Sequence, residues 1–163
     1  MQLEELVVQD FRKLAGRYAV HPARQGLTVV HGDNEEGKST LLDALKRAFF
    51  MKHNTTGEAR QEIQPQGRSA TPSVAVTFSL ADGRYRLRKV FRRGGVRLEG
   101  PTGEFEGDAA EAELARLLAF EWPGRGAAKP DQMGLAGLFW VDQGTIFAEE
   151  QRPSASARPG LDA

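Results

Sequence analysis

A glycine-rich stretch at residues 31–40, HGDNEEGKST, has the residue types and spacing of a phosphate-binding loop. Gly32 and Gly37 allow the tight turn that presents backbone N–H groups to phosphate oxygens. Lys38 has the length and charge to contact the β- and γ-phosphates of ATP, and the Ser39 hydroxyl is a ligand for Mg²⁺. The pattern therefore predicts a site for ATP and Mg²⁺. Its expected members are Gly32, Asn34, Glu35, Glu36, Gly37, Lys38, Ser39 and Thr40.

Two acidic residues of the loop, Glu35 and Glu36, would face a polyanion. Because the backbone amides do the binding, both side chains can point out of the loop. The alternative to a nucleotide site is a chance match on a strand-to-helix turn. The predicted neighbours of the loop oppose that alternative, because the motif requires a strand before it and a helix after it.

Those neighbours follow from the hydrophobic pattern. Residues 27–31, LTVVH, form a β-branched run that predicts a buried strand, and residues 38–51 predict a helix. The helix N-terminus would add partial positive charge at the phosphates. The predicted apolar face of the helix consists of Leu41, Leu42, Leu45, Ala48 and Phe49.

Most of the remaining pattern predicts strands. Residues 2–11 and 17–21 predict two strands, and residues 52–72 predict a polar loop. An antiparallel meander follows, because SVAVTFSL alternates apolar with small or polar residues and Asp82-Gly83 is a strong hairpin signal.

The later part of the chain predicts one more helix and then a tail. Residues 108–120 predict a helix with Asp108 as its N-cap and Glu111 completing a capping box. We expect one domain over residues 1–150, and a disordered tail or the start of a coiled coil or linker over residues 151–163.

Two segments, LEELVVQDFRKL at residues 3–14 and GLTVVHGDNEEGKSTLLDALKRAFF at residues 26–50, resemble the N-terminal half of an SMC/SbcC/RecF/YhaN-like ABC-type ATPase head. The resemblance implies ATPase activity and an α/β fold. The implied fold is a P-loop NTPase lobe of ABC/SMC type, with a mixed sheet, an antiparallel meander and flanking helices. By the same resemblance, Arg12 matches an arginine that lies near the nucleotide in this superfamily.

A second constellation, Asp142-Gln143-Gly144, follows the apolar run LFWV. The resemblance favours a Q-loop, in which Gln143 lies at Mg²⁺ and the γ-phosphate and acts with Lys38 in catalysis. The competing interpretation is a Walker B motif, in which Asp142 holds Mg²⁺ through water. A buried strand that ends at a turn is the third interpretation, and it gives neither residue a chemical role.

Four arginines, Arg84, Arg86, Arg88 and Arg92, share one face of the predicted strand RYRLRKVFRR, and Lys89 shares the other face with Tyr85, Leu87 and Phe91. The resemblance implies that this face contacts DNA, because SMC-type heads bind DNA phosphates. The alternative is an ordinary solvated strand face. No aromatic residue is interleaved on that face, so we expect any DNA binding to be independent of sequence.

ATP hydrolysis also needs a group that orients or activates water. In the family that the chain resembles, this group is a glutamate after the Walker B aspartate, and a second head supplies a signature loop. Neither motif occurs in this sequence. We therefore expect half of a split head, inactive alone, whose hydrolysis requires a C-terminal lobe and a second head in a homodimer.

The expected role is DNA repair, chromosome organisation or defence against foreign DNA, with a nuclease as a candidate partner. Two alternatives are a self-contained kinase that uses Asp142 and a DNA-binding module with a vestigial loop.

The composition sets limits on these interpretations. Lys plus Arg and Asp plus Glu both total 22, so any electrostatic attraction to DNA has to be local. The absence of cysteine excludes disulfides and thiolate metal sites. Neither a signal-peptide pattern nor an apolar stretch of the roughly 20 residues that span a bilayer is present. The expectation is a cytoplasmic protein with no membrane contact.

Overall fold

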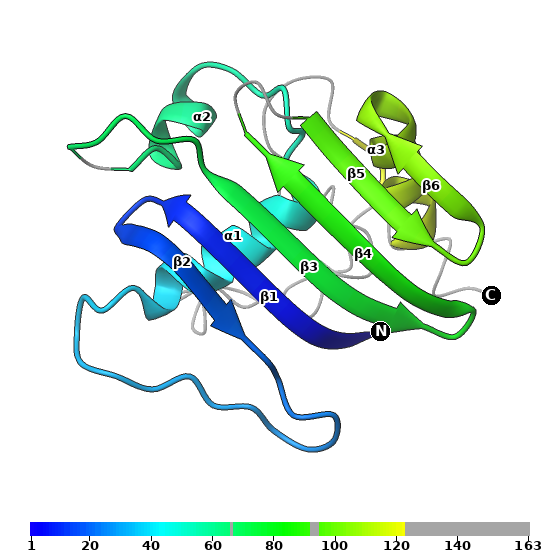
Figure 1. Ribbon diagram of the computed structural model, residues 1–163, viewed down its shortest axis with the longest axis horizontal. Helices are drawn as coiled ribbons and strands as arrows, with labels where there is room; N and C mark the ends of the chain where they lie inside the picture. Colours follow the sequence, from blue (N-terminus) through cyan, green and yellow to red (C-terminus); the bar gives the residue numbers. More distant parts are fainter. Residues whose placement is uncertain (66, 92–94, 123–163) are drawn as a thin grey trace, which may run out of the picture.

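A single sheet is the framework on which the described helices pack (Figure 1). This computed structural model describes residues 1–65, 67–91 and 95–122. Within them the sheet order is β2-β1-β3-β4-β5-β6, and each described pair of neighbouring strands is antiparallel. The described elements are, in chain order, β1 (Gln2–Phe11), β2 (Leu14–Val20), α1 (Lys38–Phe50), α2 (Glu58–Glu62), β3 (Ser73–Leu80), β4 (Gly83–Val90), β5 (Gly95–Gly100), β6 (Gly103–Glu106) and α3 (Gly107–Leu117).

One face of the sheet is apolar because successive strand side chains point to opposite faces. Val74, Val76 and Phe78 of β3 are at most 1 % exposed, as are Tyr85 and Leu87 of β4. The intervening side chains of β4 are exposed arginines. The predicted meander and its burial on one face are confirmed.

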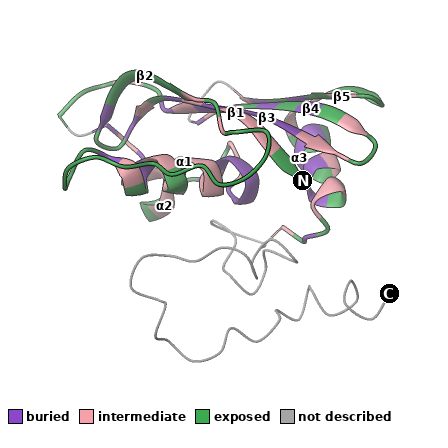
Figure 2. Ribbon diagram, turned by 90° about the horizontal axis from the view of Figure 1, so that it is seen from below, coloured by how far each residue is buried: buried purple, intermediate pink, exposed green. Residues whose placement is uncertain are grey.

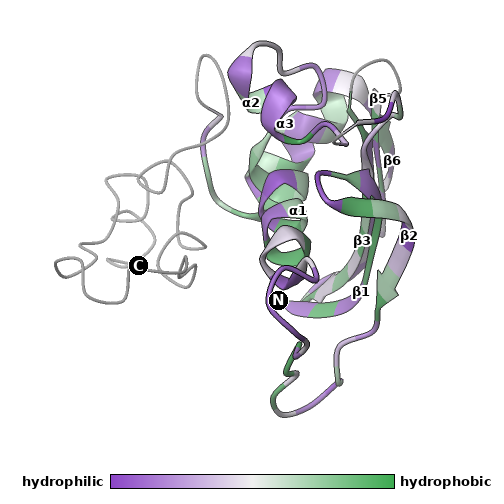
Figure 3. Cartoon of the chain, turned by 90° about the vertical axis from the view of Figure 1, so that its left-hand side faces the viewer, coloured by the Kyte–Doolittle hydropathy of each residue, from purple (hydrophilic) through white to green (hydrophobic). Residues whose placement is uncertain are grey.

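The three described helices lie on this apolar face and leave the opposite face open (Figure 2). Figure 3, turned to another side, shows the same two layers. Helix α1 contacts β1, β3 and β4, whereas α3 contacts β5 and β6. Phe49 of α1 packs edge-on against Phe78, with 5.5 Å between the ring centroids. The helix predicted over residues 38–51 is confirmed.

The buried face of α1 is rotated relative to the predicted face. Ala44, Ala48, Phe49 and Phe50 are buried, whereas Leu42 is 56 % exposed. At about 100° per residue, Ala48 lies about 40° from Ala44 around the helix axis, but Leu42 lies about 160° away. Burial of the Ala44 side therefore leaves Leu42 in solvent.

The strand predicted over residues 27–31 is not formed. Residues 21–37 contain neither strand nor helix, and Leu27, Val29 and Val30 are 85 %, 67 % and 44 % exposed. A β-branched run favours extended backbone, but a strand also needs a neighbour that satisfies its N–H and C=O groups. No described strand takes that place beside these residues.

A tight hairpin joins β1 to β2. The register of β1 shifts at Asp10, whose φ is 49° and whose Oδ1 accepts a hydrogen bond from the backbone N of Gly16 at 3.0 Å. Arg12 lies in the turn, and β2 begins at Leu14, earlier than the strand predicted over residues 17–21.

Helix α3 begins one residue before the predicted start and lacks the predicted cap. Its N-cap is Glu106, which makes no capping hydrogen bond through its side chain. Asp108 lies inside the first turn, and Glu111 is only 1 % exposed. The capping box is therefore wrong, because the Glu111 carboxylate has partners in the core instead of at the helix N-terminus.

Several predicted features lie outside the described residues: Asp142, Gln143, Arg92 and the tail at residues 151–163. In the predicted loop over residues 52–72, the described residues 52–65 and 67–72 form a loop except for the short helix α2. Across the described ranges, no helix combines the length and apolarity needed to cross a membrane.

Candidate nucleotide site

The glycine-rich loop lies at the N-terminus of α1, at the end of the long connection from β2 (Figure 1). Gly37 is the N-cap of α1, with φ 95° and ψ 14°. A Cβ atom on Gly37 would lie 2.6 Å from Cδ2 of Leu14, so backbone conformation and packing both require glycine. The N–H groups of the first turn and the positive end of the helix dipole are therefore presented at the loop.

Two charged side chains of the loop form hydrogen bonds with backbone groups of the same loop. Lys38 Nζ donates hydrogen bonds to the carbonyl oxygens of Gly32 and Asp33, at 2.8 and 2.6 Å. Glu36 Oε2 accepts a hydrogen bond from the backbone N of Asp33 at 2.9 Å. The Glu36 side chain therefore does not point out of the loop, because its carboxylate finds an amide donor within the loop.

The other loop residues differ in exposure. Asn34, Glu35 and Ser39 are exposed, whereas Thr40 is buried. Among the residues that the structure describes, no three His, Asp or Glu side chains are grouped to hold a metal ion. A Mg²⁺ ion at Ser39 would therefore take most of its ligands from nucleotide oxygens and water, as Mg²⁺ commonly does. The second predicted ligand, Gln143, lies outside the described residues.

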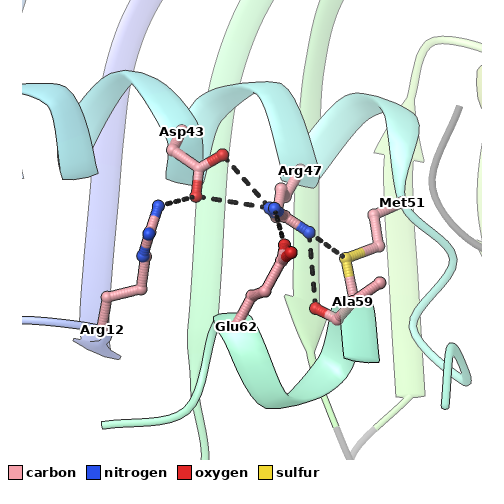
Figure 4. Close-up of polar contacts among 6 residues, drawn as sticks. All are labelled: Arg12, Asp43, Arg47, Met51, Ala59 and Glu62. Atoms are coloured by element: carbon pink, nitrogen blue, oxygen red, sulfur yellow. Dashed lines mark hydrogen bonds and ion pairs between the residues drawn. The ribbon is translucent and has the colours of Figure 1, made fainter. Parts of the chain in front are cut away.

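Arg12 lies on the flank of α1 and is tied to it by an ion pair (Figure 4). Its NH1 donates to Asp43 Oδ2 at 3.0 Å, and its backbone N donates to the Ile63 carbonyl at 3.1 Å. Asp43 also accepts a hydrogen bond from Arg47 Nε at 3.2 Å, and Arg47 NH2 pairs with Glu62 of α2 at 2.5 Å. These contacts fix the hairpin turn and α2 to α1. The nucleotide role of Arg12 stays a prediction.

Large apolar side chains are exposed on the elements that hold the loop. The edge strand β2, the connection after it and α1 all contribute. An unpaired strand edge combined with exposed apolar side chains is typical of a surface that another polypeptide covers. The exposed side chains are Tyr18, Leu27, Val29, Val30 and Leu42.

The open face of the sheet carries the arginines predicted to contact DNA, but acidic residues accompany some of them. Arg84 Nε lies 2.7 Å from Glu4 Oε2. Arg97 of β5 pairs with Glu99 at 3.3 Å and also with Glu104. These pairs neutralise part of the positive charge of the face.

Two arginines of β4 remain without such partners. Arg86 and Arg88 are exposed, and neither forms an ion pair with any residue in the described part of the chain. They are therefore the strongest candidates on this face for contact with an external anion. Arg92, the fourth predicted member, lies outside the described residues.

A buried charged cluster lies on the opposite side of the sheet, away from those arginines. Lys89 Nζ donates to the Met51 carbonyl at 2.7 Å and lies 3.7 Å from Glu111 Oε1. The same Glu111 oxygen accepts from the backbone N of His53 at 2.8 Å and lies 3.0 Å from His53 Nδ1. The Trp122 ring covers the cluster, with its centroid 4.8 Å from Lys89 Nζ.

The cluster shifts the ionisation of its lysine. Burial lowers the pKa of Lys89 to about 7, against the opposing attraction of Glu111. The alternation of the strand predicts Lys89 on its apolar face, which is confirmed. The sequence did not predict the contacts of Lys89 with Glu111, or of Glu111 with His53. The spacing of His53 and Glu111 carries no signal for a contact between the loop after α1 and a later helix. This cluster joins α3 and the segment after α1 to the sheet.

Comparison with known protein families identifies the family of the chain that has this fold and loop. The model of the AAA domain family matches residues 5–119, which is more than half of the chain and includes the glycine-rich loop. The chain belongs to the AAA domain family.

Curated relatives of this AAA domain include two DNA double-strand break repair Rad50 ATPases. That of Halobacterium salinarum is 33% identical over 105 residues, 59% of this chain and 12% of that protein. That of Pyrococcus abyssi is 30% identical over 95 residues, 57% of this chain and 11% of that protein. An uncharacterized protein of Mycobacterium tuberculosis is 28% identical over 123 residues, which is 73% of this chain but 14% of its own length. The AAA domain chain thus spans about a seventh or less of these relatives.

Among solved structures, the AAA domain resembles an SMC ATPase studied for ATP-driven dimerization and DNA-stimulated activation. The TM-score is 0.59 at 15% sequence identity, over 99% of this chain and 98% of that chain. The likeness confirms the predicted fold of a P-loop NTPase lobe of ABC/SMC type. Together with the Rad50 relatives it confirms the resemblance to the N-terminal part of an SMC-like ATPase head.

Proposed function

We propose that this chain is the ATP-binding lobe of an SMC-like ATPase head, and that it binds ATP with Mg²⁺ at the loop from Gly32 to Thr40. The observation that carries the proposal is the loop geometry. Gly37 turns the backbone into α1, and Lys38 lies over the loop carbonyls at 2.6–2.8 Å. Backbone amides, a helix N-terminus and a lysine ammonium at one point form an anion site suited to a triphosphate.

Hydrolysis on this proposal requires a second polypeptide segment. The described residues contain no group of three or more His, Asp or Glu side chains that could hold a metal ion. The exposed apolar side chains around β2 and the connection after it support docking of a C-terminal lobe there. A second head, in a homodimer, then completes the site. The names of the Rad50 relatives support action in DNA repair as part of the proposal. Chromosome organisation, defence against foreign DNA and an associated nuclease remain in the proposal as what the resemblance to SMC-type heads implies.

The test is turnover of ATP by the purified chain, alone and after addition of the C-terminal lobe of its own head. We expect no release of phosphate above background from the chain alone, and Mg²⁺-dependent release after reconstitution. Robust turnover by the chain alone would reject the split-head proposal. It would favour a self-contained enzyme, and loss of that turnover in Asp142→Ala would support the kinase interpretation.

The reconstituted head also tests the role of Gln143. On the Q-loop interpretation, Gln143→Ala retains ATP binding but loses hydrolysis and head closure. Wild-type hydrolysis in Gln143→Ala would remove Gln143 from the site. If the reconstituted head binds DNA but no nucleotide, the loop is vestigial.

We also propose that the open sheet face contacts DNA through Arg86 and Arg88. The support is their exposure and their lack of acidic partners among the described residues, together with the DNA repair function of the Rad50 relatives. Because their side chains offer charge without aromatic stacking, binding should be independent of sequence and sensitive to salt.

A double variant, Arg86→Ala with Arg88→Ala, should weaken binding of the reconstituted head to duplex DNA at low salt. It should also reduce the slope of log K against log salt by about 2, because each arginine neutralises about one phosphate. Fluorescence anisotropy at several salt concentrations measures both effects. The matched control is Arg84→Ala, whose guanidinium is already paired with Glu4. Equal effects of the double variant and the control would contradict the proposal.

A further inference from the structure

The side chain of Glu36 folds back onto the loop that contains it. Its Oε2 accepts a hydrogen bond from the backbone N of Asp33 at 2.9 Å, and its own backbone N donates to the Asp33 carbonyl at 3.4 Å. A Cβ atom built on Gly32 would collide with the same Oε2, so the carboxylate lies directly over the first glycine of the loop. The Glu36 carboxylate, an anionic group, therefore already accepts the hydrogen bond of a backbone amide in its own loop.

Lys38 forms hydrogen bonds with backbone carbonyls in the same part of the loop. Its Nζ donates to the carbonyls of Gly32 at 2.8 Å and Asp33 at 2.6 Å. The Glu36 carboxylate thus accepts a hydrogen bond from the Asp33 amide, and the Lys38 ammonium donates hydrogen bonds to the Gly32 and Asp33 carbonyls. One loop amide and the lysine ammonium, both of a kind that binds phosphate, are therefore already hydrogen-bonded within the protein.

The neighbouring acid, Glu35, behaves differently. It is exposed, and in the described part of the chain it forms neither a hydrogen bond nor an ion pair. Two adjacent carboxylates with equal formal charge therefore differ in one respect: only Glu36 occupies a loop amide.

We propose that Glu36 is an internal competitor for the nucleotide and sets the affinity of the loop for phosphate. The proposal rests on the nucleotide function proposed above. Carboxylate and phosphate oxygens accept the same kind of hydrogen bond, and one backbone N–H cannot serve both. Glu36 must therefore swing out before a phosphate contacts the Asp33 amide. The apparent affinity is the intrinsic affinity multiplied by the fraction of molecules in which Glu36 is out.

The experiment titrates the reconstituted head with a fluorescent ATP analogue and Mg²⁺, in wild type, Glu36→Ala and Glu35→Ala. Both variants remove one negative charge from the loop, but only Glu36→Ala removes the internal acceptor. A net hydrogen bond to a charged group predicts that Glu36→Ala binds about tenfold more tightly than Glu35→Ala. Glu36→Gln, which keeps a neutral acceptor, should lie between them.

A second readout needs no nucleotide. The ¹⁵N–¹H chemical shift of the Asp33 amide should move in Glu36→Ala and stay close to the wild-type position in Glu35→Ala. An unmoved Asp33 amide in Glu36→Ala would overturn the proposal, because the hydrogen bond would then be absent in solution.

The outcomes separate this inference from the proposed function. If wild type binds the nucleotide through Lys38 while Glu36→Ala and Glu35→Ala have equal affinities, the competitor is rejected and the nucleotide function stands. If neither wild type nor any variant binds the nucleotide, both are rejected.

Discussion

Replacement of Lys38 by alanine is expected to weaken binding of Mg²⁺ and ATP by about 100-fold or more. Each hydrogen bond from an ammonium to a charged acceptor contributes about 1.5–3 kcal/mol. Two such bonds, to the β- and γ-phosphates, therefore exceed the roughly 2.8 kcal/mol that corresponds to a factor of 100. The ammonium is already at the loop, within 2.8 Å of the Gly32 carbonyl, so its reach does not depend on a large rearrangement.

The measurement is isothermal titration of the reconstituted head with ATP, alongside Lys46→Ala as control. Lys46 is on the same helix but two turns further from the loop, so its replacement removes the same charge at a distance. Circular dichroism should show that α1 is retained in both variants. Wild-type affinity in Lys38→Ala would remove the loop from the proposed nucleotide site.

The other large expected effect is on folding. Glu111→Ala should lower the free energy of unfolding by about 3–5 kcal/mol, the typical cost of removing one partner from a buried charged pair. Glu111 is 1 % exposed and its carboxylate contacts Lys89 and His53. Its loss leaves the Lys89 ammonium without its counter-charge and the His53 amide without an acceptor. Urea unfolding followed by circular dichroism measures the change.

Glu113→Ala is the matched control for that experiment. Glu113 is on the same helix, but its carboxylate pairs with the exposed guanidinium of Arg116. Exposed ion pairs of this kind contribute little, so the control should retain almost the whole stability. Similar losses in the two variants would contradict the role of the buried cluster.

The pH dependence of stability tests independently how the buried cluster of Lys89, Glu111 and His53 affects the ionisation of Lys89. The pKa of Lys89 is lowered from 10.5 to about 7, so between these values the unfolded chain binds more protons than the folded chain. The contribution of this residue to stability therefore rises with pH across that window, by at most about 1.4 kcal/mol per pH unit. The difference between wild type and Lys89→Met should follow this slope, and a difference that falls with pH would contradict the assignment.

The sequence predicted the structure correctly where a short pattern has its physical cause within a few residues. The Gly-Lys-Ser spacing predicted the turn into α1, because Gly37 needs its positive φ there and helix residues follow at once. The alternation in β3 and β4 predicted their buried face, including Lys89, since side chains on a strand alternate strictly.

The errors arose where the outcome depends on a distant partner. The run at residues 27–31 has strand propensity, but the described residues give it no neighbouring strand. Glu111 fits the spacing of a capping box, but Lys89 and His53 compete for its carboxylate across the core. Leu42 is apolar, but the side of α1 that meets the sheet is set by Ala44 and Ala48. None of these choices is encoded within a few residues.

The strand order has a consequence for how the chain reaches its native state. The meander β3 to β6 pairs only strands adjacent in sequence, whereas β1 must pair Leu6 with Val76 across the entire glycine-rich segment and α1. Closure of so long a loop carries the larger entropic cost, so local hairpins are favoured to nucleate first. Because β1 pairs with β3 late, α1 and the segment around Gly37 are organised in the closing step of assembly. Ribosomal synthesis makes β1 before β3, so the hairpin of β1 and β2 forms before the strand that joins it to the meander.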